Sequence, residues 1–436
     1  MVFSTTHEGG LGARLSAYGA ALVLLCTLIA CTPSHQPNDI QGASVSHQTK
    51  SPKRGVAFNF SNVQDLPLLA PAISWDYNWA NSTGDESAIW FDARGIDFCP
   101  MCWNGSYNAD KIRAYVAAHP KTKYLLAFNE PNLTDQANLT PAQAAAVWQN
   151  VVELARGLNL KIVSPAMNYG SLAGYSDPIV WLDEFFAQPQ VSIDDICAIS
   201  VHCYMGSAGA MSGFINQFAK YNKPIWLSEF CAWENVSSVE AQMNYMCQAL
   251  TVLEQSDMVE RYAWFIPRTS APVDAAPYMQ LLTHDLQPAL TELGYIYRYF
   301  PTFNINDYLI TSRLIFAGEY ASVVGNVQLR HCTEPAILER AGDDGLFIKA
   351  MREGTQVTYQ LSVPNSTSSL TLYYISYSDC TMHLALTDGS EIDVSLSRTA
   401  GAWGSTTVNL PCKKGLNNLT VTLTHGSIHF GGLQLN

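Results

Sequence analysis

Two glutamates stand in matching surroundings in the first two thirds of the chain. Glu130 lies in the segment YLLAFNEPN and Glu229 in the segment PIWLSEF. The apolar run before each glutamate is typical of a buried β-strand, so each carboxylate is expected at a strand end. Cleavage of a glycosidic bond requires one carboxylic acid to protonate the leaving oxygen and a second carboxylate as nucleophile or base. The pair therefore predicts a glycosidase site.

The elements that position these glutamates follow an alternating pattern of strand-like and helix-like segments. This pattern is typical of a parallel sheet with crossover helices, and eight strands predict a closed (β/α)8 TIM barrel. Sites in such barrels lie at the carboxyl ends of the strands, where both glutamates are expected. The predicted strands are Gly55 to Phe60, Ile73 to Tyr77, Asp97 to Met101, Tyr124 to Phe128, Lys161 to Pro165, Cys197 to His202, Pro224 to Ser228 and Arg261 to Phe265.

One predicted helix has complete start and stop signals. Thr140 can cap its start, Pro141 suits the first turn, and Gln143 completes a capping box. The helix should then continue to Arg156 and stop at Gly157.

Several motifs occur in an order that resembles glycoside hydrolase family 128, a member of the clan of retaining (β/α)8 glycosidases. These motifs are FNEPN, NLTPAQAA, WLSEF and VERYAWF, and the resemblance covers Arg54 to Phe265. It implies hydrolysis of β-1,3-glucan by a retaining double displacement. It also implies that Glu130 is the general acid/base and Glu229 the nucleophile.

The resemblance extends to polar residues around the pair. Asn129 is expected to bind the sugar 2-hydroxyl, an interaction that strengthens in the transition state. His202 and Tyr204 follow the sixth predicted strand and are expected to hold the orientation and protonation state of Glu229. Asn59, at the end of the first strand, is a further polar candidate.

The chain holds 10 Trp and 21 Tyr, and aromatic faces pack against the apolar faces of sugar rings. Trp264 is the first candidate for sugar stacking, because clan members place a platform at the end of strand eight. The other candidates are Trp103, Trp233, Trp75 and Trp79. Trp90, Trp148 and Trp181 are expected to serve packing.

The hydrophobic pattern changes in the C-terminal third of the chain, which predicts a second domain. Residues 313–436 contain short alternating runs with Gly turns, typical of an antiparallel β-sandwich. This segment resembles carbohydrate-binding modules of families 6 and 35, with Trp403 and Tyr377 as ligand candidates. Such modules usually hold calcium, but Phe430 to Leu433 contains no carboxylate, and Glu319 and Glu339 alone do not make a site. No metal or cofactor is predicted.

The N-terminus resembles a targeting segment. Residues 1–30 read as a bacterial lipoprotein signal, with Cys31 as the lipidated residue, and 31–52 as a flexible tether before a barrel at 53–305. An ordinary secretory signal is the alternative. The protein is therefore expected to be exported, as a cell-surface or periplasmic lipoprotein if Cys31 is lipidated and as a secreted protein otherwise. A lipid on Cys31 would be its attachment to a membrane.

The net charge of the chain indicates which classes of partner are expected. The formal net charge is −13 and basic runs are absent, which disfavours nucleic acid and favours a neutral glycan as partner.

Disulfide pairing of the 11 cysteines cannot be assigned from the sequence. Cys99 and Cys102 are interpreted as packing residues or a structural disulfide rather than a redox or metal site. The protein is expected to be a monomer.

Two other functions remain open from the sequence. A clan relative could act on another neutral β-glycan, since the barrel strands alone do not fix the substrate. A non-catalytic surface glycan-binding protein could also use this scaffold, but such proteins usually lose a catalytic carboxylate. Because both Glu130 and Glu229 are present, the enzyme interpretation is favoured.

Overall fold

The computed structural model describes residues 50–436, which belong to one compact unit. The predicted signal, Cys31 and most of the predicted tether lie outside the described residues. Within residues 50–436, no helix combines the length and the apolar character needed to cross a membrane.

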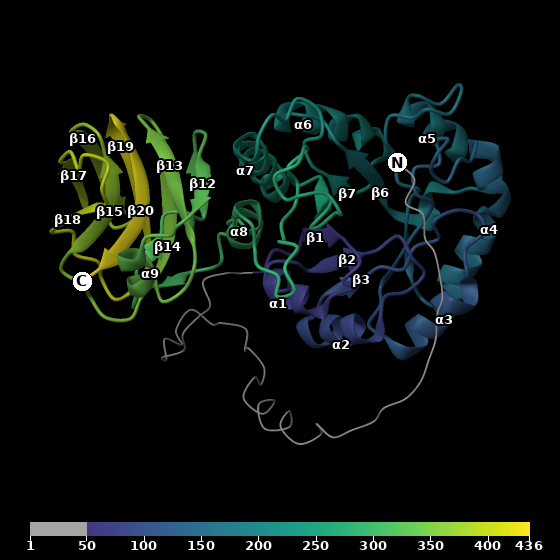
Figure 1. Cartoon of the computed structure of the whole chain (residues 1–436), viewed down its shortest axis with the longest axis horizontal. Coiled ribbons are helices and arrows are strands. Elements are labelled where there is room, and N and C mark those ends of the chain that lie inside the picture. Colours follow the sequence, from purple (N-terminus) through teal and green to yellow (C-terminus); the bar gives the residue numbers. More distant parts are fainter. Residues whose placement is uncertain (1–49) are drawn as a thin grey trace, which may run out of the picture. The chain divides into compact units, whose positions relative to one another are not determined.

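Eight parallel strands form the predicted barrel (Figure 1). They follow the order β3-β2-β1-β8-β7-β6-β5-β4, and a parallel bridge between Met101 and Leu126 joins the two ends of this sheet. All eight predicted strands are present, with bounds shifted by a few residues. They are β1 (Arg54–Ala57), β2 (Trp75–Tyr77), β3 (Asp97–Phe98), β4 (Tyr124–Leu126), β5 (Lys161–Val163), β6 (Ile196–Cys203), β7 (Ile225–Phe230) and β8 (Val259–Trp264).

Helices alternate with these strands and cover the outside of the barrel (Figure 1). The α-helices are α1 (Leu66–Leu69), α2 (Asp85–Arg94), α3 (Ala109–Ala118), α4 (Pro141–Gly157), α5 (Pro178–Phe186), α6 (Ala208–Asn216), α7 (Val239–Gln255) and α8 (Glu292–Tyr299). Short 3-10 turns are η1 (Val63–Asp65), η2 (Ile193–Asp195) and η3 (Gln217–Tyr221). The capping box of Thr140 and Gln143 at α4 is confirmed. Trp148 and Trp181 are fully buried, as expected of packing residues.

Side chains fill the barrel interior as a cluster separate from the layer between strands and helices. Because successive residues of a strand face opposite sides, each strand contributes alternate residues to this interior. The interior cluster is Ala57, Trp75, Tyr77, Cys99, Met101, Leu126, Val163, Ala198, Trp226 and Ala263. The barrel is thus a packed core, and chemistry is confined to its ends.

The C-terminal segment forms two sheets that are antiparallel except for the pairing of β9 with β14, and the expected β domain is confirmed. One sheet has the order β12-β13-β20-β15-β18 with β10 beside β20, and the other has β11-β14-β19-β16-β17 with β9 beside β14. The elements are β9 (Leu309–Ile310), β10 (Ile315–Phe316), β11 (Ser322–Val324), β12 (Gln328–His331), α9 (Pro335–Ala341), β13 (Leu346–Arg352), β14 (Gln356–Val363), β15 (Leu370–Ser376), β16 (Cys380–Leu386), β17 (Glu391–Leu396), β18 (Gly404–Val408), β19 (Gly415–His425) and β20 (Ser427–Leu435).

Strands β12 and β13 pack against the barrel helices α7 and α8. Glu240 on α7 accepts from Arg330 at 2.6 Å and from Lys349 at 2.8 Å. The rings of Tyr295 on α8 and His331 on β12 are stacked. The sandwich is therefore attached to the barrel by charged and aromatic contacts as well as by the chain.

The nine cysteines among the described residues are free thiols, and most of them are buried. Cys99 and Cys102 are both fully buried, which agrees with the packing interpretation and not with a disulfide between them. Burial also raises the pKa of both thiols well above the usual value, so neither resembles a reactive thiolate.

Candidate active site

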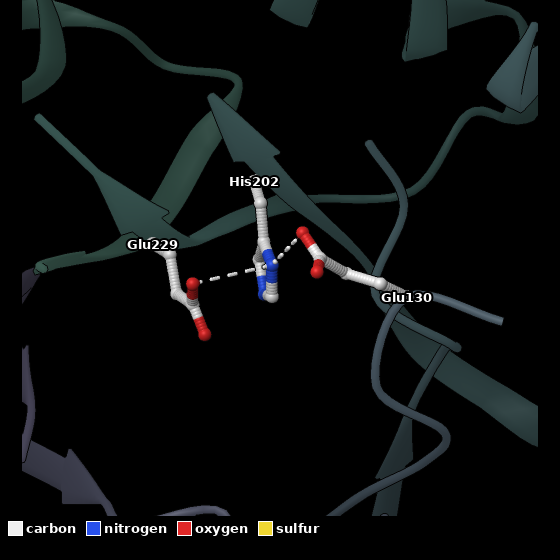
Figure 2. Close-up of side chains that lie close together, drawn as sticks. All are labelled: Glu130, His202 and Glu229. Atoms are coloured by element: carbon white, nitrogen blue, oxygen red, sulfur yellow. Dashed lines mark hydrogen bonds and ion pairs between the residues drawn. The ribbon is translucent and has the colours of Figure 1, made fainter. Parts of the chain in front are cut away.

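Glu130 and Glu229 lie side by side at the carboxyl ends of the barrel strands, with His202 between them (Figure 2). One carboxylate oxygen of each glutamate and a ring nitrogen of His202 all lie within 4.8 Å of one another. Glu130 is 8% exposed and Glu229 is 4% exposed. The site thus holds two nearly buried carboxylates within reach of a single small group.

A local irregularity in β7 turns Glu229 toward the site. Trp226 faces the barrel interior, so strict alternation would direct Glu229 toward the helices. Leu227 pairs with Val201 of β6, but Glu229 pairs with His202, so β7 contains one extra residue at this point. Such a bulge redirects the side chains that follow it. The nucleophile candidate therefore reaches the interior because of the bulge.

The backbone of Glu130 also departs from the regular pattern. Its φ is 44°, a left-handed conformation that is unfavourable for residues other than glycine. Strain of this kind is typical of functional positions, where the surrounding structure maintains it.

Three donors hold the Glu229 carboxylate. Oε1 accepts from the Tyr77 hydroxyl and from Trp79 Nε1, both at 2.7 Å, and Oε2 accepts from the Tyr204 hydroxyl. Burial, and then the adjacent Glu229, raise the pKa of Tyr77 and Tyr204 well above the usual value. Both phenols therefore stay protonated as donors to the carboxylate.

Glu130 receives a different set of donors. Its Oε1 lies 2.9 Å from His202 Nδ1 and accepts from Asn168 Nδ2 at 3.2 Å. Burial by itself would lower the pKa of His202, but the charges of Glu229 and then Glu130 outweigh burial and raise it. The imidazolium form is thus favoured between the two carboxylates. His202 contacts the acid/base candidate more closely than the nucleophile candidate.

The same three side chains also resemble a metal-ligand set by composition and proximity. The hydrogen bonds just described already engage both oxygens of Glu229 and Oε1 of Glu130. The arrangement fits a pair of carboxylates kept in distinct surroundings, which is how acid and nucleophile roles are separated in glycosidases.

The other polar candidates, Asn129 and Asn59, differ in exposure. Asn129 is 3% exposed, and its Nδ2 donates to Gln136 at 3.0 Å, while its Oδ1 has no hydrogen-bond partner among residues 50–436. Because this oxygen is itself buried, the expected bond from Asn129 to a sugar hydroxyl stays a prediction. Asn59 is exposed and accepts from Asn78 Nδ2 at 3.3 Å.

The structure corrects two of the predicted stacking residues. Trp264 is fully buried and donates from Nε1 to the Met279 carbonyl at 2.7 Å, so it cannot present a face to a sugar. Alternation in β8 directs Trp264 to the helix layer and the next residue, Phe265, to the interior. Trp75 is also fully buried, and it stacks on Tyr77 within the interior cluster of the barrel.

Other aromatic candidates remain accessible beside the glutamates. Trp233 is 43% exposed and packs edge-on against Tyr204, and Trp103 is partly buried. Trp79 and Tyr204 each make edge contacts with the partly exposed Phe265. Phe265, Tyr77 and Asn168 were not among the sequence candidates. The spacing of Trp75, Tyr77 and Trp79 on one strand face was the signal that could have identified Tyr77.

In the sandwich, the two ligand candidates differ in exposure. Tyr377 is 67% exposed, whereas Trp403 is partly buried and packs over Gly431, where a Cβ would lie 2.7 Å from its ring. Glu319, a possible source of calcium ligands, is paired with Arg313 at 2.7 Å. The candidates stay predictions.

The glycosyl hydrolase catalytic core family matches residues 55–297. The chain is thus a glycoside hydrolase. Alkali-sensitive linkage protein 1 from Schizosaccharomyces pombe is 26% identical over 236 residues, 52% of this chain. The chain spans 40% of the length of that curated relative.

Two crystal structures extend the comparison. A family 128 subgroup II endo-β-1,3-glucanase from Pseudomonas viridiflava is 36% identical, with a TM-score of 0.52, and the match covers 57% of this chain and 98% of that chain. An enzyme with the same description from Sorangium cellulosum is 32% identical, with a TM-score of 0.51, covering 56% and 97%. The chain belongs to glycoside hydrolase family 128.

Proposed function

We propose that this protein hydrolyses β-1,3-glucan by double displacement, with Glu130 as general acid/base and Glu229 as nucleophile. The observation that carries the proposal is the approach of the two carboxylates to within 4.8 Å at the carboxyl ends of the strands. Retaining enzymes hold their carboxyl groups about 5–5.5 Å apart, whereas inverting enzymes need roughly 6.5–9.5 Å for a water. The substrate assignment is supported by the two family 128 structures, both described as endo-β-1,3-glucanases.

The donors around Glu229 suit its proposed role as nucleophile. A carboxylate oxygen of Glu229 attacks the anomeric carbon while Glu130 gives its proton to the leaving glycosidic oxygen. In the second step Glu130 takes a proton from water, and the water oxygen displaces Glu229 from the sugar. The donors Tyr77, Trp79 and Tyr204 keep Glu229 oriented and stabilise its charge when it leaves.

Product analysis of the purified protein tests the proposal. Laminarin, curdlan, mixed-linkage glucan, cellulose and xylan are each incubated with the protein, and released oligosaccharides are separated by size and linkage. We expect β-1,3-linked products from laminarin or curdlan, whose sizes distinguish endo from exo action. If products form only from another glycan, that glycan replaces β-1,3-glucan as the assigned substrate. Binding to glucan without any product would favour a capture protein.

Two substitutions separate the roles of the glutamates. Glu229→Ala should abolish hydrolysis of every substrate, because no nucleophile remains. Glu130→Gln should lose activity on glucan but retain it on an aryl β-glycoside with an acidic leaving group, because such a group departs without protonation. Equal losses on both substrates in Glu130→Gln would contradict the acid role.

Export and a lipid on Cys31 are also proposals, resting on the residues before the described part of the chain. Labelling of cells with a palmitate analogue tests the lipid. A labelled wild-type protein and an unlabelled Cys31→Ala variant would support it, and equal labelling of both would contradict it.

A further inference from the structure

A single buried side chain fastens the loop that follows the nucleophile strand. Strand β7 ends at Phe230, and the next residues carry Trp233, which is 43% exposed. Trp233 packs edge-on against Tyr204, and its backbone N–H donates to the Tyr204 carbonyl at 3.0 Å. Since Tyr204 also donates to Glu229, the position of Trp233 is defined relative to the nucleophile candidate.

Gln242 on α7 occupies both backbone hydrogen-bonding groups of the residue before Trp233. Its Oε1 accepts from the Ala232 N–H at 3.3 Å, and its Nε2 donates to the Ala232 carbonyl at 2.8 Å. The same Nε2 donates to the Pro277 carbonyl at 2.6 Å, in the loop that follows β8. Gln242 is fully buried, so water does not replace these bonds. One amide thus joins the loops after β7 and β8.

The choice of glutamine follows from this geometry. The site needs one acceptor and two donors on one planar group, and a glutamine amide provides that combination. A methionine would fill the same space without any of the three bonds. An asparagine would keep the amide but carry it on a side chain one carbon shorter.

The helix that carries Gln242 is held on its other side by the sandwich. Glu240, two residues earlier, is paired with Arg330 and Lys349 of β12 and β13. Further along α7, Cys247 lies against the backbone of Leu329. The first turn of α7 is therefore fixed to the sandwich. These contacts restrain the helix that carries Gln242 and so restrain the loop that Gln242 binds.

We propose that Gln242 is a positioning residue that holds Trp233 at the substrate-binding face and thereby sets the affinity for β-1,3-linked oligosaccharides. This inference rests on the proposed function. Gln242 does not contact the glutamates in any described hydrogen bond, so its loss should act on substrate binding more than on bond cleavage.

The test compares KM and kcat for a soluble β-1,3-glucohexaose in the full chain. Gln242→Met should raise KM by roughly 3- to 10-fold, the factor for one weakened aromatic contact, with kcat changed by less than about twofold. Trp233→Ala should raise KM at least as much. The double variant should match Trp233→Ala alone, because a residue that acts through Trp233 has no effect once that ring is gone.

A matched control separates positioning from general destabilisation. Gln360 in β14 is also buried and donates to a backbone carbonyl, that of Ile305, but it lies in the sandwich. Gln360→Met should lower the melting temperature without changing KM. If Gln242→Met does not fold, Gln242→Asn provides the same comparison.

Several outcomes would overturn the inference. An unchanged KM in folded Gln242→Met or Gln242→Asn would show that the loop does not need the amide. Additive KM effects in the double variant would show that Gln242 does not act through Trp233. A wild-type protein without activity on any β-1,3-glucan would instead refute the proposed function.

Discussion

Removal of one hydroxyl from the nucleophile's surroundings should slow breakdown of the glycosyl-enzyme. Tyr77→Phe deletes the donor that lies 2.7 Å from Glu229 Oε1 and keeps the ring, which is stacked on Trp75 and edge-on to Trp79. The Glu229 carboxylate regains its charge when the intermediate hydrolyses. The lost bond to that charge therefore matters most in the second step.

The expected magnitude follows from the kind of bond. A hydrogen bond to a charged group contributes about 1.5–3 kcal/mol, which corresponds to about a 10- to 150-fold decrease in rate. The lower part of this range is expected, because Trp79 still donates to the same oxygen at 2.7 Å. The charge is also only partly developed in the transition state.

The assay uses an activated aryl β-1,3-glucoside, for which breakdown of the intermediate limits turnover. Stopped-flow release of the aryl group should show a burst followed by a slower steady rate in Tyr77→Phe. Tyr359→Phe is the matched control, because that buried hydroxyl donates at 2.8 Å to the Ala317 carbonyl in the sandwich. A folded Tyr77→Phe with kcat within about twofold of wild type would refute the reasoning.

Two further predictions concern stability. Asp76 is fully buried, its carboxylate has no hydrogen-bond partner in the described part of the chain, and burial raises its pKa well above the usual 3.8. The folded state therefore resists ionisation that the unfolded state undergoes, and stability falls as the pH rises above about 3.8. Asp76→Asn should raise the free energy of unfolding at pH 7 but not below pH 3.8, measured by urea titration; a gain that is equal at both pH values would contradict this. Arg54→Met should cost about 3–5 kcal/mol in the same assay, because it leaves the buried Glu254 carboxylate without its partner at 2.6 Å. Arg54→Met/Glu254→Leu should recover part of that loss, and no recovery would argue against the buried charge as the cause.

The barrel could be predicted from the sequence because its signals are local. Each strand is a short apolar run, and α4 carries a complete capping box between Thr140 and Gln143. The two glutamates were identified in the same way, since each stands at or near the end of such a run. The bounds of the strands were less accurate, because tertiary pairing decides where a strand ends.

The errors in the site have one physical origin. Sequence reasoning placed aromatic residues near strand ends but not on a particular face or at a particular depth. Depth separates Trp75, which is fully buried in the barrel interior, from Trp79 on the same strand face, which contacts Glu229. Alternation separates the buried Trp264 from Phe265.

The inward direction of Glu229 was beyond prediction for a different reason. It depends on the extra residue in β7, and a bulge is fixed by how two strands pair rather than by a residue type. Contacts across the chain, such as Gln242 with Ala232 and Pro277, are likewise properties of the folded barrel.

The anomeric form of the first product tests the central claim most directly. Proton NMR of a soluble β-1,3-gluco-oligosaccharide, recorded within the first minutes of hydrolysis, distinguishes the α and β anomers before they interconvert. Attack by Glu229 followed by water predicts that the β anomer appears first. Initial release of the α anomer would contradict the double displacement, and absence of any product would contradict the assignment of the substrate.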